Sequence, residues 1–63
     1  MIKYRVIAKK NLEATPHTWT EGLDYEVVEK RDYFTLASNE GQVNYYNTVK
    51  NMVMYSFEKI YSS

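Results

Sequence analysis

Apolar and polar side chains alternate along several short stretches of this chain, and that alternation restricts its fold more than any other feature. Within residues 2–9 the apolar members occupy every second position, as Ile2, Tyr4, Val6 and Ala8. Residues 23–30 repeat the pattern, with Leu23, Tyr25 and Val27 on the apolar side. Successive side chains of a strand point to opposite faces, so both stretches predict half-buried β-strands.

Two more strands follow from residue types and a turn signal. Residues 33–37 are rich in β-forming residues, and we expect Phe34 and Leu36 on the inner face. Residues 38–41 have the sequence Ser-Asn-Glu-Gly, which is typical of a tight turn closed by glycine. Residues 42–46 are therefore predicted to return as a neighbouring strand.

Residues 10–22 show neither a helical nor a strand period. They contain the only proline of the chain and several threonines, so we expect a long loop. A loop of this length is unusual in so small a domain, which makes it a candidate for function. Alternatively, Leu12 and Trp19 fold the segment back onto the core.

The end of the chain fits two structures. Apolar residues within 48–61 recur at three- and four-residue spacing, which predicts a helix packed on the sheet. Every second residue from 53 to 57 is also apolar, which predicts a strand. A short helical turn followed by a strand satisfies both patterns, and the sequence leaves the choice open. We expect Met52 in the core and Met54 at the surface.

The segment Trp-Thr-Glu-Gly-Leu-Asp-Tyr-Glu-Val at residues 19–27 resembles an element of small SH3-like β-barrel proteins of bacteria and phages. Its pattern is an apolar residue, Thr, any residue, Gly, two variable positions and Tyr-x-Val. The resemblance implies a mainly β fold. We expect a single domain over residues 1–63, a small SH3-like antiparallel barrel of about five strands with a short helical turn near the C-terminus. The alternative is a four-stranded meander with a C-terminal helix. The resemblance also implies a binding role and transfers no catalytic residue.

Composition limits how such a domain can be stabilised. The 63 residues include no cysteine, and His17 is the only histidine, whereas structural zinc needs four Cys or His ligands. A chain this short buries only about 60% of the surface that it exposes when unfolded. It therefore needs a dense aromatic core, self-association or both. Seven tyrosines, two phenylalanines and one tryptophan supply the rings.

Charge excludes some partners. Eight basic and eight acidic residues cancel, which argues against a dedicated DNA-backbone binder and against an acidic DNA mimic. The first ten residues are nevertheless purely basic, and residues 11–32 hold six acids against two bases. We expect neighbouring strands to carry complementary charges on their exposed faces; the alternative is a basic strip that contacts a partner. We expect no membrane span or export signal, and the lack of cysteine favours the cytoplasm.

Tyrosines provide the candidate interaction surface. Tyr33 and Tyr46 fall on the outer sides of neighbouring strands, and Asn44 shares that side. With His17 or Trp19 beside them they would form a partner-binding patch, because Tyr and Trp offer large contact areas. The alternatives are a plain cross-strand aromatic pair for the tyrosines and, for Trp19, core packing over the open end of the barrel.

The chain contains no recognisable catalytic set, because cysteine is absent and no acidic residue neighbours His17. We therefore expect no enzyme, no cofactor and no metal. We expect a protein-interaction module, such as a small phage or mobile-element accessory or inhibitor protein that binds a host protein. One alternative is a small-barrel nucleic-acid binder, with phosphate contacts from Lys3, Arg5, Lys9 and Lys10. The other is a self-associating structural protein, such as a homodimer.

Overall fold

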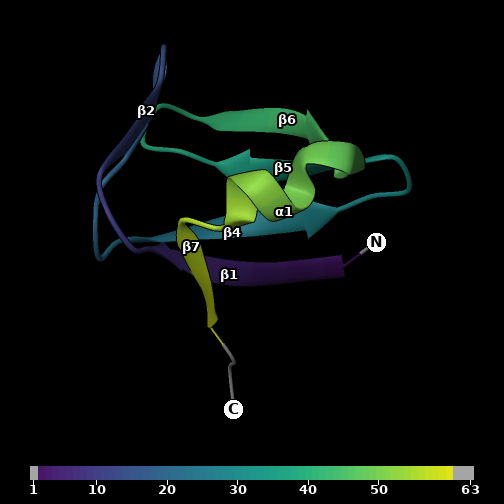
Figure 1. Cartoon of the computed structure of the whole chain (residues 1–63), viewed down its shortest axis with the longest axis horizontal. Helices are drawn as coiled ribbons and strands as arrows, with labels where there is room; N and C mark the ends of the chain where they lie inside the picture. The colour runs from purple at the N-terminus through teal and green to yellow at the C-terminus, as the bar shows by residue number, and fades with distance from the viewer. Residues whose placement is uncertain (1, 61–63) are drawn as a thin grey trace.

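The computed structural model describes residues 2–60, which form mainly β structure in two sheets (Figure 1). The strands are β1 (Ile2–Ala8), β2 (Leu12–Ala14), β3 (His17–Trp19), β4 (Asp24–Glu29), β5 (Tyr33–Ala37), β6 (Gln42–Tyr46) and β7 (Phe57–Ile60). A 3₁₀ turn, η1 (Asn47–Val49), and a short helix, α1 (Lys50–Met54), precede β7. Five strands form one antiparallel sheet in the order β6-β5-β4-β1-β7, and β2 and β3 form a separate hairpin.

Alternation correctly predicted the inner faces of β1 and β4. These strands pair antiparallel with Val6 opposite Tyr25, and both side chains are buried. Ala8 and Val27 are buried beside them. Ile2 and Leu23, which we expected to face inward, are 59% and 50% exposed. The reason is their position, because Ile2 begins β1 and Leu23 precedes β4, at the margins of the core.

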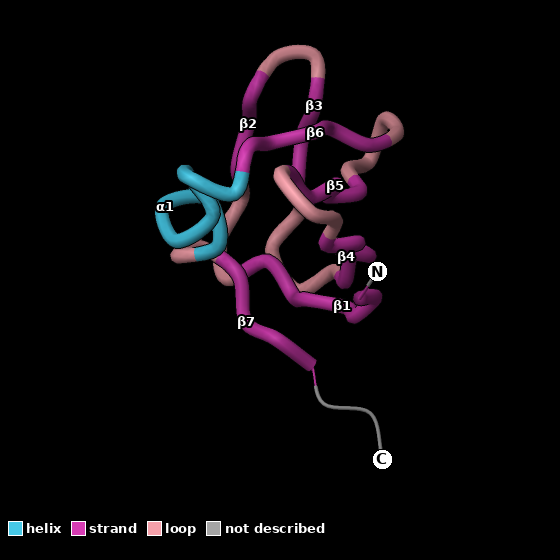
Figure 2. Tube along the Cα trace, turned by 90° about the vertical axis from the view of Figure 1, so that its right-hand side faces the viewer, coloured by secondary structure: helices cyan, strands magenta, loops and turns pink. Residues whose placement is uncertain are grey.

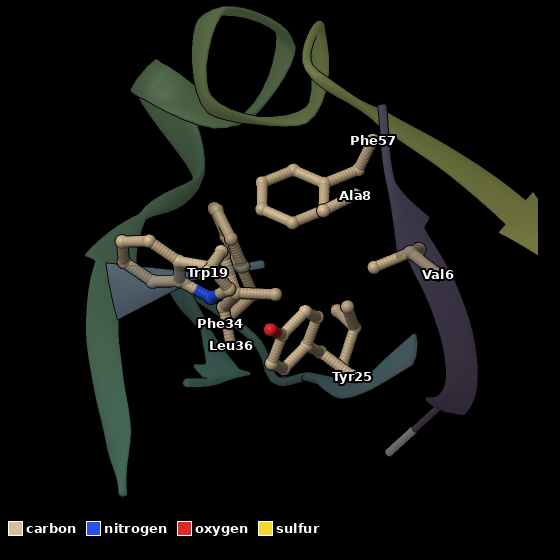
Figure 3. Packing of buried hydrophobic residues seen from close by; sticks show 8 residues of the cluster. Val6, Ala8, Trp19, Tyr25, Phe34, Leu36 and Phe57 are labelled. Carbon is tan, nitrogen blue, oxygen red and sulfur yellow. The ribbon is translucent and has the colours of Figure 1, made fainter. Parts of the chain in front are cut away.

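One cluster of side chains makes the core (Figure 3). Its buried members come from β1, β3, β4, β5 and β7: Val6, Ala8, Trp19, Tyr25, Val27, Phe34, Leu36 and Phe57. Phe57 meets Trp19 and Tyr25 edge to face, with ring centroids 6.2 and 6.5 Å apart. Phe34 and Leu36 are almost fully buried, and such burial stabilises a fold by about 1.5–3 kcal/mol for each side chain. The aromatic core that the composition predicted is therefore present.

The first long loop differs from the prediction, because it contains a hairpin. Strands β2 and β3 pair antiparallel, with Leu12 opposite Trp19 and Ala14 opposite His17. The turn between them contains a cis Thr15–Pro16 peptide bond. The three-residue strands were too short to show a period. Trp19 is buried and Leu12 packs against the core, so the segment folds back as the alternative interpretation predicted.

The C-terminal segment is a helical turn followed by a strand, and the rival prediction of one continuous helix is wrong. Strand β7 pairs antiparallel with β1 and completes the five-stranded sheet (Figure 2). Residue 61, the last of the apolar series, lies outside the described residues. The expected places of the two methionines are also wrong, since Met52 is 72% exposed and Met54 packs against the core. Helical rotation over α1 turns Val53 and Met54 inward and leaves Met52 outside.

The sheet ends on one side in β6 and on the other in β7, and these two strands are not paired with each other within residues 2–60. Helix α1 spans the opening between them in both views (Figure 1, Figure 2). No helix among residues 2–60 has the length and apolar character needed to span a membrane.

Candidate protein-interaction surface

Tyr33 and Tyr46 lie directly opposite each other on β5 and β6. Their neighbours in sequence, Phe34 and Tyr45, face the core and pack ring against ring, with centroids 5.6 Å apart. Strand alternation therefore turns Tyr33 and Tyr46 to the outer face, as predicted. Tyr46 is 74% exposed, and Tyr33 is half-buried.

A hollow of about 280 Å³ opens beside these rings and is lined by Tyr33, Asn44, Tyr45 and Tyr46. Phenol rings and the Asn44 amide give it apolar walls with hydrogen-bonding groups at the rim. The Lys30 ammonium lies over the Tyr33 ring, 5.7 Å from its centroid. The hollow can therefore accept an aromatic or aliphatic side chain that also carries a polar group.

The turn beside the hollow is held by Asn47. Its backbone N–H donates to Asp32 O at 3.1 Å, and its side-chain Nδ2 donates to Arg31 O at 3.1 Å. These bonds fix residues 30–33 against the start of η1. The Tyr33 ring therefore projects from a strand end that is hydrogen-bonded to Asn47.

His17 and Trp19 do not join this surface. Trp19 is only 4% exposed, and its Nε1 donates to Ala37 O at 2.7 Å, at the opposite end of β5 from Tyr33. The Nδ1 of His17 lies 2.7 Å from Ser38 Oγ, also at that far end. The structure therefore brings Tyr33, Asn44 and Tyr46 together and places Trp19 in the core, in agreement with the alternative interpretation of that residue.

A polar network fastens the hairpin to the turn after β5, and sequence reasoning missed it. The Glu40 carboxylate accepts bonds from the backbone N–H and from the hydroxyl of Thr18, each at 2.6 Å. The hydrogen bond from the Thr18 hydroxyl is the main cause that lowers the pKa of Glu40. Nearby, the Tyr25 hydroxyl donates to Asn39 Oδ1 at 2.9 Å and accepts a bond from the Thr20 N–H at 2.7 Å. The several threonines of the loop were its only sequence signal.

A second network joins α1 to the sheet through Glu29. Its carboxylate accepts hydrogen bonds from Lys50 Nζ and from the Tyr4 hydroxyl, each at 2.5 Å. The hydrogen bond from Lys50, followed by that from Tyr4, holds the pKa of Glu29 below its ordinary value. Burial, together with the bond to Glu29, raises the pKa of Tyr4 far above the ordinary value for tyrosine. Lys59 Nζ lies 4.6 Å from the centroid of the Tyr4 ring. Tyr4, Glu29 and Lys50 are hydrogen-bond or ion-pair partners of one another, and they link α1 to β1 and β4.

The basic first strand lies next to the acidic β4, as the charge pattern predicted. Arg5 Nε and Asp24 Oδ2 are 2.5 Å apart, and both side chains are about half exposed. The hydrogen bond from Arg5 lowers the pKa of Asp24. Lys3, Lys9 and Lys10 are exposed.

A smaller hollow of about 200 Å³ lies between β2 and α1, and its lining includes Leu12, Val53 and the exposed Met52. Among residues 2–60 no three His, Cys, Asp or Glu side chains gather in a way that could hold a metal ion. Comparisons with protein-family models, curated proteins and solved structures gave no match.

Proposed function

We propose that this chain is a non-enzymatic protein-interaction module that binds a partner protein through the tyrosine surface, defined as Tyr33, Asn44 and Tyr46. The observation that carries the proposal is the pair of tyrosines facing each other across β5 and β6, beside an open hollow, with one ring 74% exposed. Tyrosine is among the residues that contribute most to protein interfaces, since it adds a large rigid ring and a hydroxyl at small entropy cost.

The proposal includes an SH3-like fold. Its support is the order of elements, in which a long first segment holding a hairpin separates β1 from β4, and a helical turn precedes β7. It also includes a biological setting, namely a small accessory or inhibitor protein of a phage or mobile element that acts in the cytoplasm on a host protein. The neutral charge of the chain suits a protein partner better than a nucleic acid.

The test is capture of a partner from a bacterial lysate by the immobilised protein. We expect a stoichiometric host protein, and we expect Tyr46→Ala to weaken its binding on the order of tenfold or more. Tyr55→Ala is the matched control, because Tyr55 is 80% exposed and lies outside the hollow. The proposal is contradicted if both variants lose binding of the partner equally, or if both keep it equally. It is also contradicted if nucleic acid is recovered in place of protein.

A further inference from the structure

Strand β6 has an open edge. Within residues 2–60 it pairs with β5 on one side and is the terminal strand of the sheet on the other (Figure 1). Its sequence, Gln-Val-Asn-Tyr-Tyr, contains no charged residue and no proline. Charged residues and proline commonly protect an edge strand from pairing with another chain. The other terminal strand, β7, does carry them, as Glu58 and Lys59. The edge of β6 is therefore unprotected.

The backbone groups that face this open edge follow from two hydrogen bonds. Ser38 N–H donates to Gly41 O at 2.7 Å, and Asn47 N–H donates to Asp32 O at 3.1 Å, so the residue pairs that flank the β5–β6 ladder are hydrogen-bonded. Bonded and non-bonded pairs alternate along an antiparallel ladder. Every second pair between them is therefore bonded, and three residues of β6 direct their N–H and C=O groups away from β5: Gln42, Asn44 and Tyr46.

We propose that a second copy of this chain pairs with β6 along this edge, antiparallel and about a two-fold axis at Asn44. The axis places Asn44 opposite Asn44 of the second copy, and Gln42 opposite Tyr46 of the second copy. Three residue pairs are then aligned through their outward backbone groups. The Asn44 pair exchanges two hydrogen bonds. Each Gln42–Tyr46 pair forms the bond from the Tyr46 N–H to the Gln42 C=O, because the Tyr46 C=O is the N-cap carbonyl of η1 and already accepts the first bond of that turn. The two five-stranded sheets become one continuous sheet.

A second copy fits this edge for reasons of charge and of core size. An uncharged strand meets its own copy with no like charges opposed, and a chain with eight acids and eight bases has no net charge to keep copies apart. A domain of 63 residues without cysteine also lacks the disulfides that often support small cores. Pairing adds Val43 opposite Tyr45 of the second copy on the inner face, and both residues already pack against the core.

Pairing also covers side chains on the outer face. The ring of Tyr46, now 74% exposed, comes to lie beside Gln42 of the second copy, and the two Asn44 amides meet at the axis. This inference goes beyond the proposed function, and pairing would cover Asn44 and Tyr46 of the tyrosine surface. It relies on the backbone edge of β6, whereas the proposed function relies on the rings beside the hollow.

The first test is a change of charge at the axis, read as mass by sedimentation or light scattering. The monomer is 7.5 kDa, and we expect the mass to double with rising protein concentration. Asn44→Lys and Asn44→Asp each set two like charges face to face and should weaken pairing on the order of tenfold or more. An equimolar mixture of the two variants should pair again, because its charges are opposite. Thr48→Lys, an exposed change just outside β6, should pair like the original chain.

The second test is amide hydrogen exchange at single residues. The Val43 N–H faces β5 and should be protected at every concentration. The Asn44 N–H should become protected only where the mass doubles. The inference is overturned by any of four results: a chain that stays monomeric at about 1 mM, a mass that Asn44→Lys leaves unchanged, a mixture that does not pair, or a dimer in which the Asn44 amide still exchanges freely. A dimer that persists in Tyr33→Ala while lysate capture is lost separates this inference from the proposed function.

Discussion

Trp19 shows how one residue can suit two roles in the sequence and only one in the structure. A tryptophan in an irregular, Thr-rich segment is a plausible contact residue, because exposed tryptophans are common at interface hot spots. In the fold its ring lies against Phe57 and its Nε1 donates to Ala37 O. A side chain that is 4% exposed offers a partner protein almost no contact area, so Trp19 contributes to the stability of the fold.

Substitution of Trp19 should therefore act on the free energy of unfolding. Trp19→Ala should cost about 3–5 kcal/mol, because it leaves a cavity among the core rings and removes the hydrogen bond to Ala37 O. Trp19→Phe should cost less, since it keeps most of the ring volume. Urea denaturation followed by circular dichroism measures both. The exposed Tyr55→Ala should change stability by less than about 0.5 kcal/mol, and a Trp19→Ala variant that is equally stable would refute the core role.

At the scale of elements, the strands of the five-stranded sheet were largely predictable, because alternation of side chains is a local property. β1, β4, β5 and β6 all lie where the residue pattern placed them. The hairpin and the inward face of α1 could not be predicted in this way. Each hairpin strand spans three residues, less than two periods of alternation, and its position depends on Glu40 and Asn39 beyond β5. Of the candidate site, the tyrosine surface follows from alternation, whereas the location of His17 does not.

The link between α1 and the sheet should make stability depend on pH. Lys50 and Tyr4 hold the pKa of Glu29 below its ordinary value of 4.5 in the folded state, so the unfolded chain takes up the proton more readily. The stabilising contribution is therefore complete above about pH 4.5 and is lost as the pH falls through the folded pKa. Glu29→Gln should lower the urea midpoint near pH 7, and its difference from the original chain should shrink toward about pH 3.

A control for this prediction removes the cation instead of the acid. Lys50→Met deletes the partner that lowers the pKa of Glu29 most, so the acid-sensitive part of the stability curve should shift toward pH 4.5. If the original chain and Glu29→Gln keep a constant difference across the whole pH range, the link does not depend on the charge of Glu29.

At the scale of the whole molecule, folding and assembly should be coupled. If copies pair along β6, the folded dimer is favoured by mass action, and the thermal midpoint rises with protein concentration. A tenfold increase in concentration should raise the midpoint by roughly a few degrees for a domain of this size. Asn44→Lys should remove that dependence without unfolding the monomer, because the Asn44 backbone groups do not bond to β5. A midpoint that is constant over a hundredfold range for the original chain would rule out this coupling.

The alternation of residue types is enough to specify amphipathic strands around an aromatic interior, because successive side chains of a strand point to opposite faces. What each outer face and edge meets depends on the packing of the whole chain. That packing buried Trp19, exposed Met52, joined Glu29 to Lys50 and, within residues 2–60, left one edge of β6 without a neighbouring strand. These outcomes depend on how elements distant in sequence pack together, and no local pattern carries that information.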